Sequence, residues 1–249
     1  MKFEDLEGHN FWETNKPFFD KARLQIQRNC GEILKVYKNT WPKMTYRGLR
    51  SNHPVLFSHI DKERVPGYLE RSKQIVIDQS LSNLGMTALR GNSIFCAGER
   101  VARTWGSNCY AVFPVNGYSF TWYPHFYGSV VHGESDYLYT AYAHAEHVMR
   151  RMLQVKPDET RELIQKYGGG IDFESKAANH DGYDEADYLA FINIFHHTEE
   201  GAPYNQGLEQ AIDRSSELLI TGRGYYGVYI GYGDSTKEWR SYLESIVTP

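Results

Sequence analysis

The sequence has few cysteines and no excess of positive charge, and each shortage excludes a class of protein. Only three cysteines, Cys30, Cys96 and Cys109, occur among 249 residues, and no two of them form a CxxC pair. A disulfide framework or a zinc ribbon is therefore not expected, and a reducing compartment is favoured. The formal net charge is -4, so no global basic field favours binding to duplex nucleic acid.

The sequence also lacks a long apolar run. No stretch is long enough to span a bilayer, and the opening residues MKFEDLEGHNFWE lack the apolar core of a signal peptide. We therefore expect no membrane partner. We expect a protein made in the cytoplasm that acts there or in the cytoplasm of a host or target cell.

What the chain does have is a hydrophobic fraction of 41%, enough to bury a sizeable core. Hydrophobic spacing predicts helices over 15–36, 66–85 and 136–167 and in the tail after 235. Short strands are predicted at 44–49, 55–57, 93–97, 109–115, 117–123, 217–221 and 225–232. Helices that come first and in the middle, with dispersed short strands, are typical of an α+β fold. We divide the chain into an N-terminal helical segment, 1–40, and a domain over 41–249, which together form one compact unit.

Three polar residues lie at the edges of predicted strands. Arg47 stands in TYRGLR, Ser93 in RGNSIF and Glu217 in SSELLI. An arginine offers a forked donor for a diphosphate, and a serine offers a small donor and acceptor. A carboxylate can accept a hydrogen bond from a ribose hydroxyl and stabilise a developing cation. Taken singly, each residue also fits an ion-paired surface position or a solvated strand end.

In this order, TYRG at 45–48, NSIF at 92–95 and SSELLI at 215–220 resemble the Arg-Ser-Glu class of ADP-ribosyltransferases, a group that includes many bacterial toxins, effectors and phage enzymes. The resemblance extends over residues 40–235. It implies an ADP-ribosyltransferase-like split β-sheet with N-terminal and central helical segments. It also implies a pentosyl-transfer (glycosyltransferase) reaction with NAD as substrate, in which the nicotinamide–ribose bond is cleaved and ADP-ribose passes to an acceptor.

The resemblance assigns catalytic roles to the three polar residues. Arg47 would hold the phosphates and ribose of NAD. Ser93 would brace the nicotinamide-ribose region and position Glu217. Glu217 would hydrogen-bond the ribose 2′-hydroxyl and stabilise the oxocarbenium-like ion formed as nicotinamide leaves.

Neighbouring residues receive cofactor-binding roles from the same resemblance. Gly48 would let the backbone approach the nicotinamide amide, because a side chain there would block it. An aromatic ring would stack on the nicotinamide, and Phe95 and Tyr110 are both candidates for it.

The acceptor is left open by two departures from the family pattern. The second motif is Ser-Ile-Phe rather than Ser-Thr-Ser, and Ser215 stands where arginine-modifying enzymes carry Glu or Gln. An arginine acceptor is therefore not expected, and another side chain, a nucleic-acid base, a small molecule or water gains weight. Tyr204 and Asn205, in the polar loop before Glu217, are the residues expected to face the acceptor together with Ser215.

Two alternatives from other classes stay open. The first is a non-catalytic binding or structural module, such as a phage or secretion-associated protein that keeps the fold without the activity. The second is a related fold that acts on an RNA 2′-phosphate with NAD. Such chemistry asks for several basic residues around the phosphate, and the weakly acidic chain argues against it.

We expect no metal site. His144 and His147 lie three apart in HAEHVM, and His196 and His197 are adjacent, but the HExxH spacing is missing. The glycine-rich stretches also lack the phosphate-loop pattern, and no His-Asn pairing supports a cysteine nucleophile.

Overall fold

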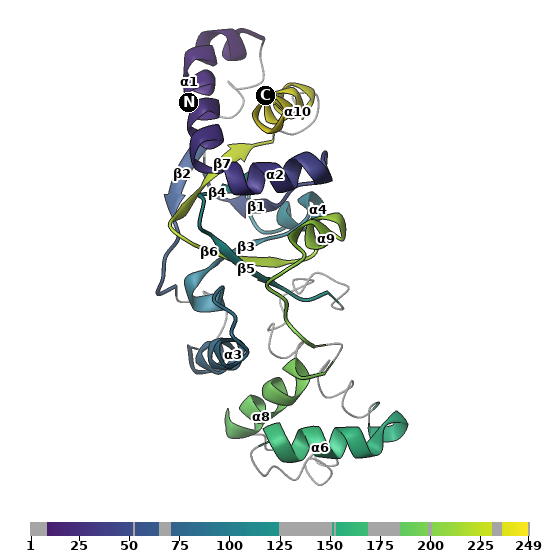
Figure 1. Ribbon diagram of the computed structural model, residues 1–249. Helices are drawn as coiled ribbons and strands as arrows, with labels where there is room; N and C mark the ends of the chain where they lie inside the picture. The colour runs from purple at the N-terminus through teal and green to yellow at the C-terminus, as the bar shows by residue number, and fades with distance from the viewer. Residues whose placement is uncertain are drawn as a thin grey trace.

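The computed structural model describes residues 9–51, 53–64, 71–124, 151, 153–168, 185–198, 201–230 and 236–248, and every structural statement below concerns these residues. Two antiparallel sheets lie at the centre (Figure 1), with the strand orders β1-β4-β7-β2 and β3-β6-β5. The strands are β1 Tyr46–Leu49, β2 Val55–His59, β3 Ile94–Cys96, β4 Asn108–Pro114, β5 Ser119–Trp122, β6 Leu218–Thr221 and β7 Gly224–Tyr229. The predicted α+β class is confirmed.

Helices lie on both sides of the sheets. They are α1 His9–Asn29, α2 Gly31–Thr40, α3 Arg71–Asn83, α4 Glu99–Ala102, α6 Pro157–Tyr167, α8 Glu185–His196, α9 Leu208–Asp213 and α10 Thr236–Val247, with a 3-10 turn, η2, at Arg90–Asn92. The helix predicted over 15–36 is real but breaks at Cys30 into α1 and α2. Of the helix predicted over 136–167, the residues before 151 lie outside the described part of the chain.

The larger core joins the N-terminal helices to the four-stranded sheet. Strand β4 is buried along its whole length, which is typical of a strand covered on both faces. Figure 1 places α1, α2 and α10 together on one side of this sheet. Ile26, Ile33 and Tyr37 from α1 and α2 belong to the same buried cluster as Val112 and Phe113 of β4. The helical segment and the sheets therefore share one core.

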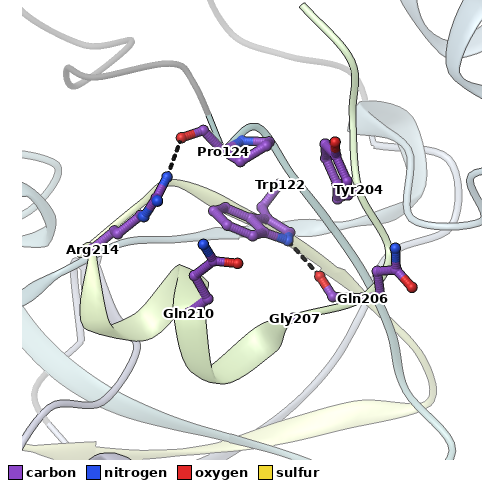
Figure 2. Close-up of a pocket in the computed structure, with 7 residues that line it drawn as sticks. All are labelled: Trp122, Pro124, Tyr204, Gln206, Gly207, Gln210 and Arg214. Carbon is purple, nitrogen blue, oxygen red and sulfur yellow. Dashed lines mark hydrogen bonds between the residues drawn. The ribbon is translucent and has the colours of Figure 1, made fainter. Parts of the chain in front are cut away.

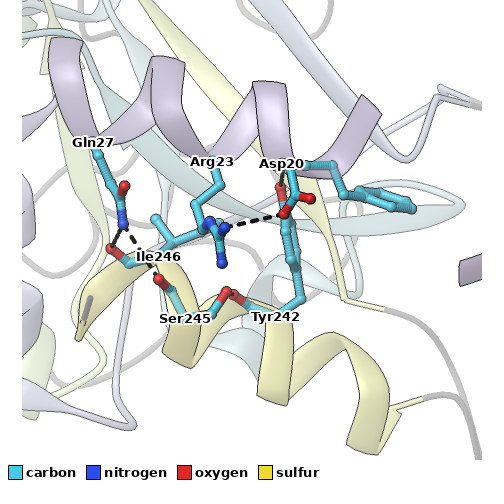
Figure 3. A network of polar contacts seen from close by, with 7 residues as sticks. Asp20, Arg23, Gln27, Tyr242, Ser245 and Ile246 are labelled. Atoms are coloured by element: carbon cyan, nitrogen blue, oxygen red, sulfur yellow. Dashed lines mark hydrogen bonds and ion pairs between the residues drawn. The ribbon is translucent and has the colours of Figure 1, made fainter. Parts of the chain in front are cut away.

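Polar contacts fasten α1 to α10 (Figure 3). The side-chain amide of Gln27 donates to the carbonyl oxygens of Ser245 and Ile246, both at 3.3 Å. These carbonyls lie in the last turn of α10, where no later N–H of the helix donates to them. The Tyr242 hydroxyl donates to the carbonyl of Phe19 at 2.8 Å. The C-terminal helix is thus tied to the N-terminal one, in part through last-turn carbonyls of α10 that would otherwise lack partners.

A smaller core lies between the three-stranded sheet and the helices α3 and α8. Ile77 and Leu81 of α3 pack with Ile192 of α8 and Leu219 of β6. At its edge, His196 is buried between two hydroxyls. Its Nδ1 lies 2.8 Å from Ser80 Oγ and its Nε2 lies 3.1 Å from the Tyr123 hydroxyl. Burial, reinforced by the neighbouring His197, lowers the pKa of His196 to about 3, so this imidazole is neutral in the folded protein.

Because the unfolded chain binds a proton at His196 near pH 6.5 and the folded chain does not, acidification costs stability. We expect His196 to reduce the free energy of unfolding by up to about 1.4 kcal/mol for each pH unit below 6.5. Urea unfolding of the wild type and of His196→Gln from pH 5 to 7.5 measures this. The difference between the two proteins should vary with pH, and a constant difference would contradict the assignment.

Candidate functional site

The two sheets meet where β1 pairs with the residue after β3. The backbone N–H of Tyr46 donates to the Ala97 carbonyl at 2.8 Å, and the N–H of Ala97 donates to the Tyr46 carbonyl at 2.9 Å. Arg47 comes next along β1. Its Nη1 donates to the carbonyl of Phe95 in β3 at 3.3 Å. The arginine of the first motif therefore lies against the strand of the second motif.

The third motif reaches the same junction through β6. Strand β6 is antiparallel to β3, with Leu218 opposite Cys96, and Glu217 immediately precedes it. Burial raises the pKa of the Cys96 thiol to about 12, while Arg47 lowers it and Glu217 raises it. Both charged groups thus act on one buried thiol. Arg47 and Glu217 thus belong to segments that both adjoin the end of β3, and their joint role in one site stays a prediction.

Alternation along the strands places three of the motif residues on one face of the three-stranded sheet. Ile94 and Cys96 point into the larger core, so Ser93 and Phe95 face the opposite side. Leu219 packs in the smaller core beside Phe95, and Glu217 shares its side of β6 by the same alternation. Ser93, Phe95 and Glu217 therefore line the face that α3 and α8 partly cover.

Glu217 is half-buried, and its burial and the nearby Arg90 have opposite effects on its ionisation. Its Oε2 is buried and has no hydrogen-bond partner among the described residues. Burial raises the pKa of this carboxyl from 4.5 to about 7, against an opposing effect of Arg90. A carboxylate held this way is ready to accept a hydrogen bond from a ligand hydroxyl, which would satisfy the buried oxygen.

Ser93 makes a different contact from the one expected. Its side chain is 1% exposed, and its hydroxyl donates to Asn92 Oδ1 at 3.0 Å. The same amide oxygen accepts the backbone N–H of Leu89 at 2.8 Å. Within the described residues Ser93 forms no hydrogen bond to Glu217. Its hydroxyl therefore stabilises the η2 turn at the entrance to β3, rather than positioning Glu217 directly.

Gly48 has a structural reason for lacking a side chain. A Cβ there would collide with the Ala102 carbonyl and lie 2.6 Å from Gly106 N, so the segment after α4 fills the space that a side chain needs. The backbone N–H and carbonyl of Gly48, in contrast, are not used in pairing with β4. Since Tyr46 directs its N–H and carbonyl toward Ala97, the same groups of Gly48, two residues along, point away from β4. The expected backbone approach to a ligand amide stays a prediction, but the obstacle to a side chain is the protein itself.

Neither aromatic candidate for nicotinamide stacking presents a free ring. Tyr110 is fully buried in β4, and its hydroxyl donates to the carbonyls of Ser51 and His53, both at 3.0 Å. That prediction is wrong, because β4 is covered on both faces. The ring of Phe95 is instead engaged by two guanidinium groups, whose Cζ atoms lie 4.7 Å (Arg64) and 4.8 Å (Arg90) from its centroid.

The residues expected to face an acceptor lie on one connected segment before β6. The backbone of Tyr204 pairs with Trp122 through hydrogen bonds of 2.8 and 2.9 Å. Asn205 is exposed. Ser215 is also exposed and has a φ of 56°, and it presses on Gly98, where an added Cβ would lie 2.5 Å from the Ser215 Cβ. Ser215 thus acts as a tight backbone turn directly before Glu217.

A pocket of about 350 Å³ lies beside this segment (Figure 2), lined by Trp122, Pro124, Tyr204, Gln206, Gly207, Gln210 and Arg214. The Trp122 indole N–H donates to the Gln206 carbonyl at 2.7 Å, and Arg214 Nη1 donates to the Pro124 carbonyl at 2.7 Å. These bonds fasten the segment to the end of β5. Trp122 belongs to the larger core, so the pocket opens on the opposite face of the sheet from Glu217.

Sequence reasoning missed Arg64 and Arg90. Both come from segments outside the predicted strands, and although Arg90 opens the stretch RGNSIF, only Ser93 of that stretch was singled out. Of the histidine candidates, His144 and His147 lie outside the described residues. His196 is hydrogen-bonded to Ser80 and Tyr123. His197 stacks on Tyr167, with 3.5 Å between the ring centroids. No group of three His, Cys, Asp or Glu side chains with metal-binding geometry occurs in the described part.

Comparison of the chain with protein-family models, with curated proteins and with solved structures finds no match in any of the three. Conclusions about the site therefore depend on the geometry given above. Across the described ranges, no helix has both the length and the apolar character needed to cross a membrane.

The tight contact at Gly48 is testable by stability. We expect Gly48→Ala to lower the free energy of unfolding by about 2–3 kcal/mol, since the methyl group meets backbone atoms that cannot rotate away. Gly31→Ala is the matched control, because a Cβ at Gly31 meets nothing within 4 Å. Denaturant unfolding of both variants decides the matter. Equal stabilities would show that the segment after α4 does not pack as described.

Proposed function

We propose that the chain is an NAD-dependent mono-ADP-ribosyltransferase with an ADP-ribosyltransferase-like split sheet. The observation that supports this best is that Arg47 and Glu217 both adjoin the end of β3, Arg47 through its hydrogen bond to Phe95 and Glu217 as the residue before β6. The Oε2 of Glu217 is buried and without a partner among the described residues. NAD is the substrate. The acceptor is a macromolecule or small molecule other than arginine, because Ser215 cannot activate a guanidinium group.

In the proposed reaction the bond between the nicotinamide nitrogen and ribose C1′ breaks, and its electron pair leaves with nicotinamide. The cation at C1′ is stabilised by ionised Glu217, which also accepts a hydrogen bond from the 2′-hydroxyl. Arg47 holds a phosphate and so fixes the distance between the diphosphate and the reacting carbon. The acceptor nucleophile then forms the new bond to C1′ and loses its proton.

A second candidate is a nucleotide-binding module without activity. The contact that favours it is the hydrogen bond from Ser93 to Asn92, because a serine used in this way does not hold Glu217 for catalysis. Such a module would bind NAD and release no nicotinamide.

Glu217→Gln tests the catalytic assignment. We expect nicotinamide release, followed by mass spectrometry with NAD and cell lysate, to fall at least about 100-fold, because the amide keeps the shape but not the charge. Glu209→Gln removes an exposed carboxylate of α9 and is the matched control, with release unchanged. Release by the Glu217→Gln variant at the wild-type rate would refute the role of Glu217.

The pKa of Glu217 predicts how the rate depends on pH. Only the ionised carboxylate stabilises the cation, so the rate should rise from pH 6 to pH 8 with an inflection near 7.

The free energy of unfolding should instead fall as the pH rises. Between pH 4.5 and 7 the folded protein binds the proton more tightly than the unfolded chain, so this group's contribution to stability is lost as the pH rises.

At pH 8, Glu217→Gln should therefore be more stable than the wild type, by roughly 1–3 kcal/mol. Denaturant unfolding at pH 5 and pH 8 provides the comparison. A variant that is less stable than the wild type at pH 8 would mean that the carboxylate is not held in a desolvated position.

A further inference from the structure

The pocket beside β5 (Figure 2) has walls that are tied to one another by hydrogen bonds. Trp122 and Tyr204 exchange two backbone hydrogen bonds, of 2.8 and 2.9 Å, and the indole N–H of Trp122 donates to the Gln206 carbonyl at 2.7 Å. The Pro124 carbonyl accepts a hydrogen bond from Arg214 at 2.7 Å. The end of β5, the segment 204–207 and α9 are therefore fastened together, so the pocket is formed before any ligand arrives.

Gly207 keeps part of this pocket unfilled. Its φ of 73° lies in the left-handed region, which favours glycine. A Cβ there would lie 3.6 Å from Cζ2 of Trp122 and 3.5 Å from Oε1 of Gln210. A side chain at 207 would thus contact both the indole and the Gln210 amide, and the glycine leaves that space to a ligand.

The polar groups of the pocket are mainly neutral amides. Gln206 and Gln210 are both exposed lining residues, and neither side chain forms a hydrogen bond within the described part of the chain. Each amide carries a donor and an acceptor in one plane. No carboxylate is among the described residues that line the pocket, and the Arg214 guanidinium is engaged by the Pro124 carbonyl. Recognition here therefore depends on hydrogen bonds of uncharged groups.

One aromatic ring has a surface left for a ligand. Trp122 is 1% exposed, whereas Tyr204 is half-buried. The two rings lie 6.2 Å apart between centroids and are tilted by 49°, so Trp122 supports the Tyr204 ring from within. A planar heteroaromatic ring can pack against a tyrosine held in this way.

The size of the pocket and its groups together suit a single base. Ligand pockets generally range from about 300 to 1,000 Å³, so a pocket of about 350 Å³ admits one small molecule or one base. A glutamine amide matches the adjacent donor and acceptor that adenine presents at N6 and N7, through two parallel hydrogen bonds. A metal ion, in contrast, would find no carboxylate, imidazole or thiolate among the described lining residues.

We propose that this pocket binds an adenine base, with Gln206 and Gln210 hydrogen-bonded to the edge of the base and Tyr204 packed against its face. The pocket opens on the opposite face of the three-stranded sheet from Glu217, so it is separate from the catalytic site proposed above and does not rest on it. The base belongs to a free nucleoside or to single-stranded nucleic acid, since both present the same edge.

Calorimetric titration with adenosine tests the residues of the pocket. We expect Gln206→Ala and Gln210→Ala each to weaken adenosine binding about 3- to 10-fold, and Tyr204→Leu to weaken it at least about 5-fold. Gln79→Ala removes an exposed amide of α3 and is the matched control, with affinity unchanged. Wild-type affinity in both lining-glutamine variants would overturn the inference.

An analogue tests which edge of the base is read. 7-Deazaadenosine keeps the shape of adenosine but lacks the N7 acceptor, so it should bind the wild type about 3- to 10-fold more weakly than adenosine does. This difference should shrink in the glutamine variant whose amide contacts N7. Equal binding of the two nucleosides, or binding of glucose as tight as that of adenosine, would contradict recognition of adenine.

A short single-stranded oligodeoxyadenylate distinguishes the two sources of the base. Tighter binding of the oligonucleotide than of adenosine, weakened by Gln210→Ala, supports the pocket with a nucleic-acid strand as its ligand. Binding of adenosine at least as tight as that of the oligonucleotide supports it with a free nucleoside. If neither binds at millimolar adenosine, the inference is wrong.

Photolabelling of the wild-type protein locates the ligand without relying on a variant that has to fold. 8-Azidoadenosine should label residues 122–124 or 204–214, as read by mass spectrometry of peptides, and excess adenosine should protect them. Labelling confined to β3 or to Glu217 would place adenosine at the junction of the sheets and overturn the pocket, while nicotinamide release still decides the enzyme. Labelling of the pocket in a protein that releases no nicotinamide supports the pocket and refutes the enzyme.

Discussion

The two hydrogen bonds between Tyr46 and Ala97 are the contact on which the candidate site depends. They join the edge of the four-stranded sheet to the end of β3, and β3 in turn pairs with β6. Arg47 follows Tyr46 and Glu217 precedes β6, so each charged group inherits its place from backbone pairing rather than from a side-chain contact. Residues some 170 positions apart in the sequence are thereby brought to one junction.

The site brings several positive charges close together and buries a carboxylate, an arrangement that a purely structural region would avoid. Burial disfavours ionisation of Glu217, and three arginines repel one another around Phe95. Such positions persist when surrounding structure holds them in place. Here the support comes from two hydrophobic cores on opposite faces of the three-stranded sheet, which together stabilise strands whose ends carry the charges.

The apolar pattern of the sequence predicted most strands and the position of Glu217 at the start of one, because period-two alternation survives in short strands. Arg47, expected at the end of its strand, lies inside β1. The pattern could not tell that Tyr110 is buried, since an aromatic residue has the same pattern in a core and in a cleft. Arg64 and Arg90 were missed for another reason. They reach Phe95 from a loop and a 3-10 turn, where no periodicity relates sequence position to direction in space.

The short helix α4 connects the two halves of the site through two close backbone approaches. Gly48 and Gly106 let β1 lie directly against the segment that follows α4, and Gly98 at its N-terminus leaves space for the left-handed turn at Ser215. One end of α4 therefore supports the strand that carries Arg47, and the other end supports the turn that precedes Glu217. The four-residue helix α4 therefore packs against both segments, and a serine at 215 serves this geometry whatever acceptor the protein uses.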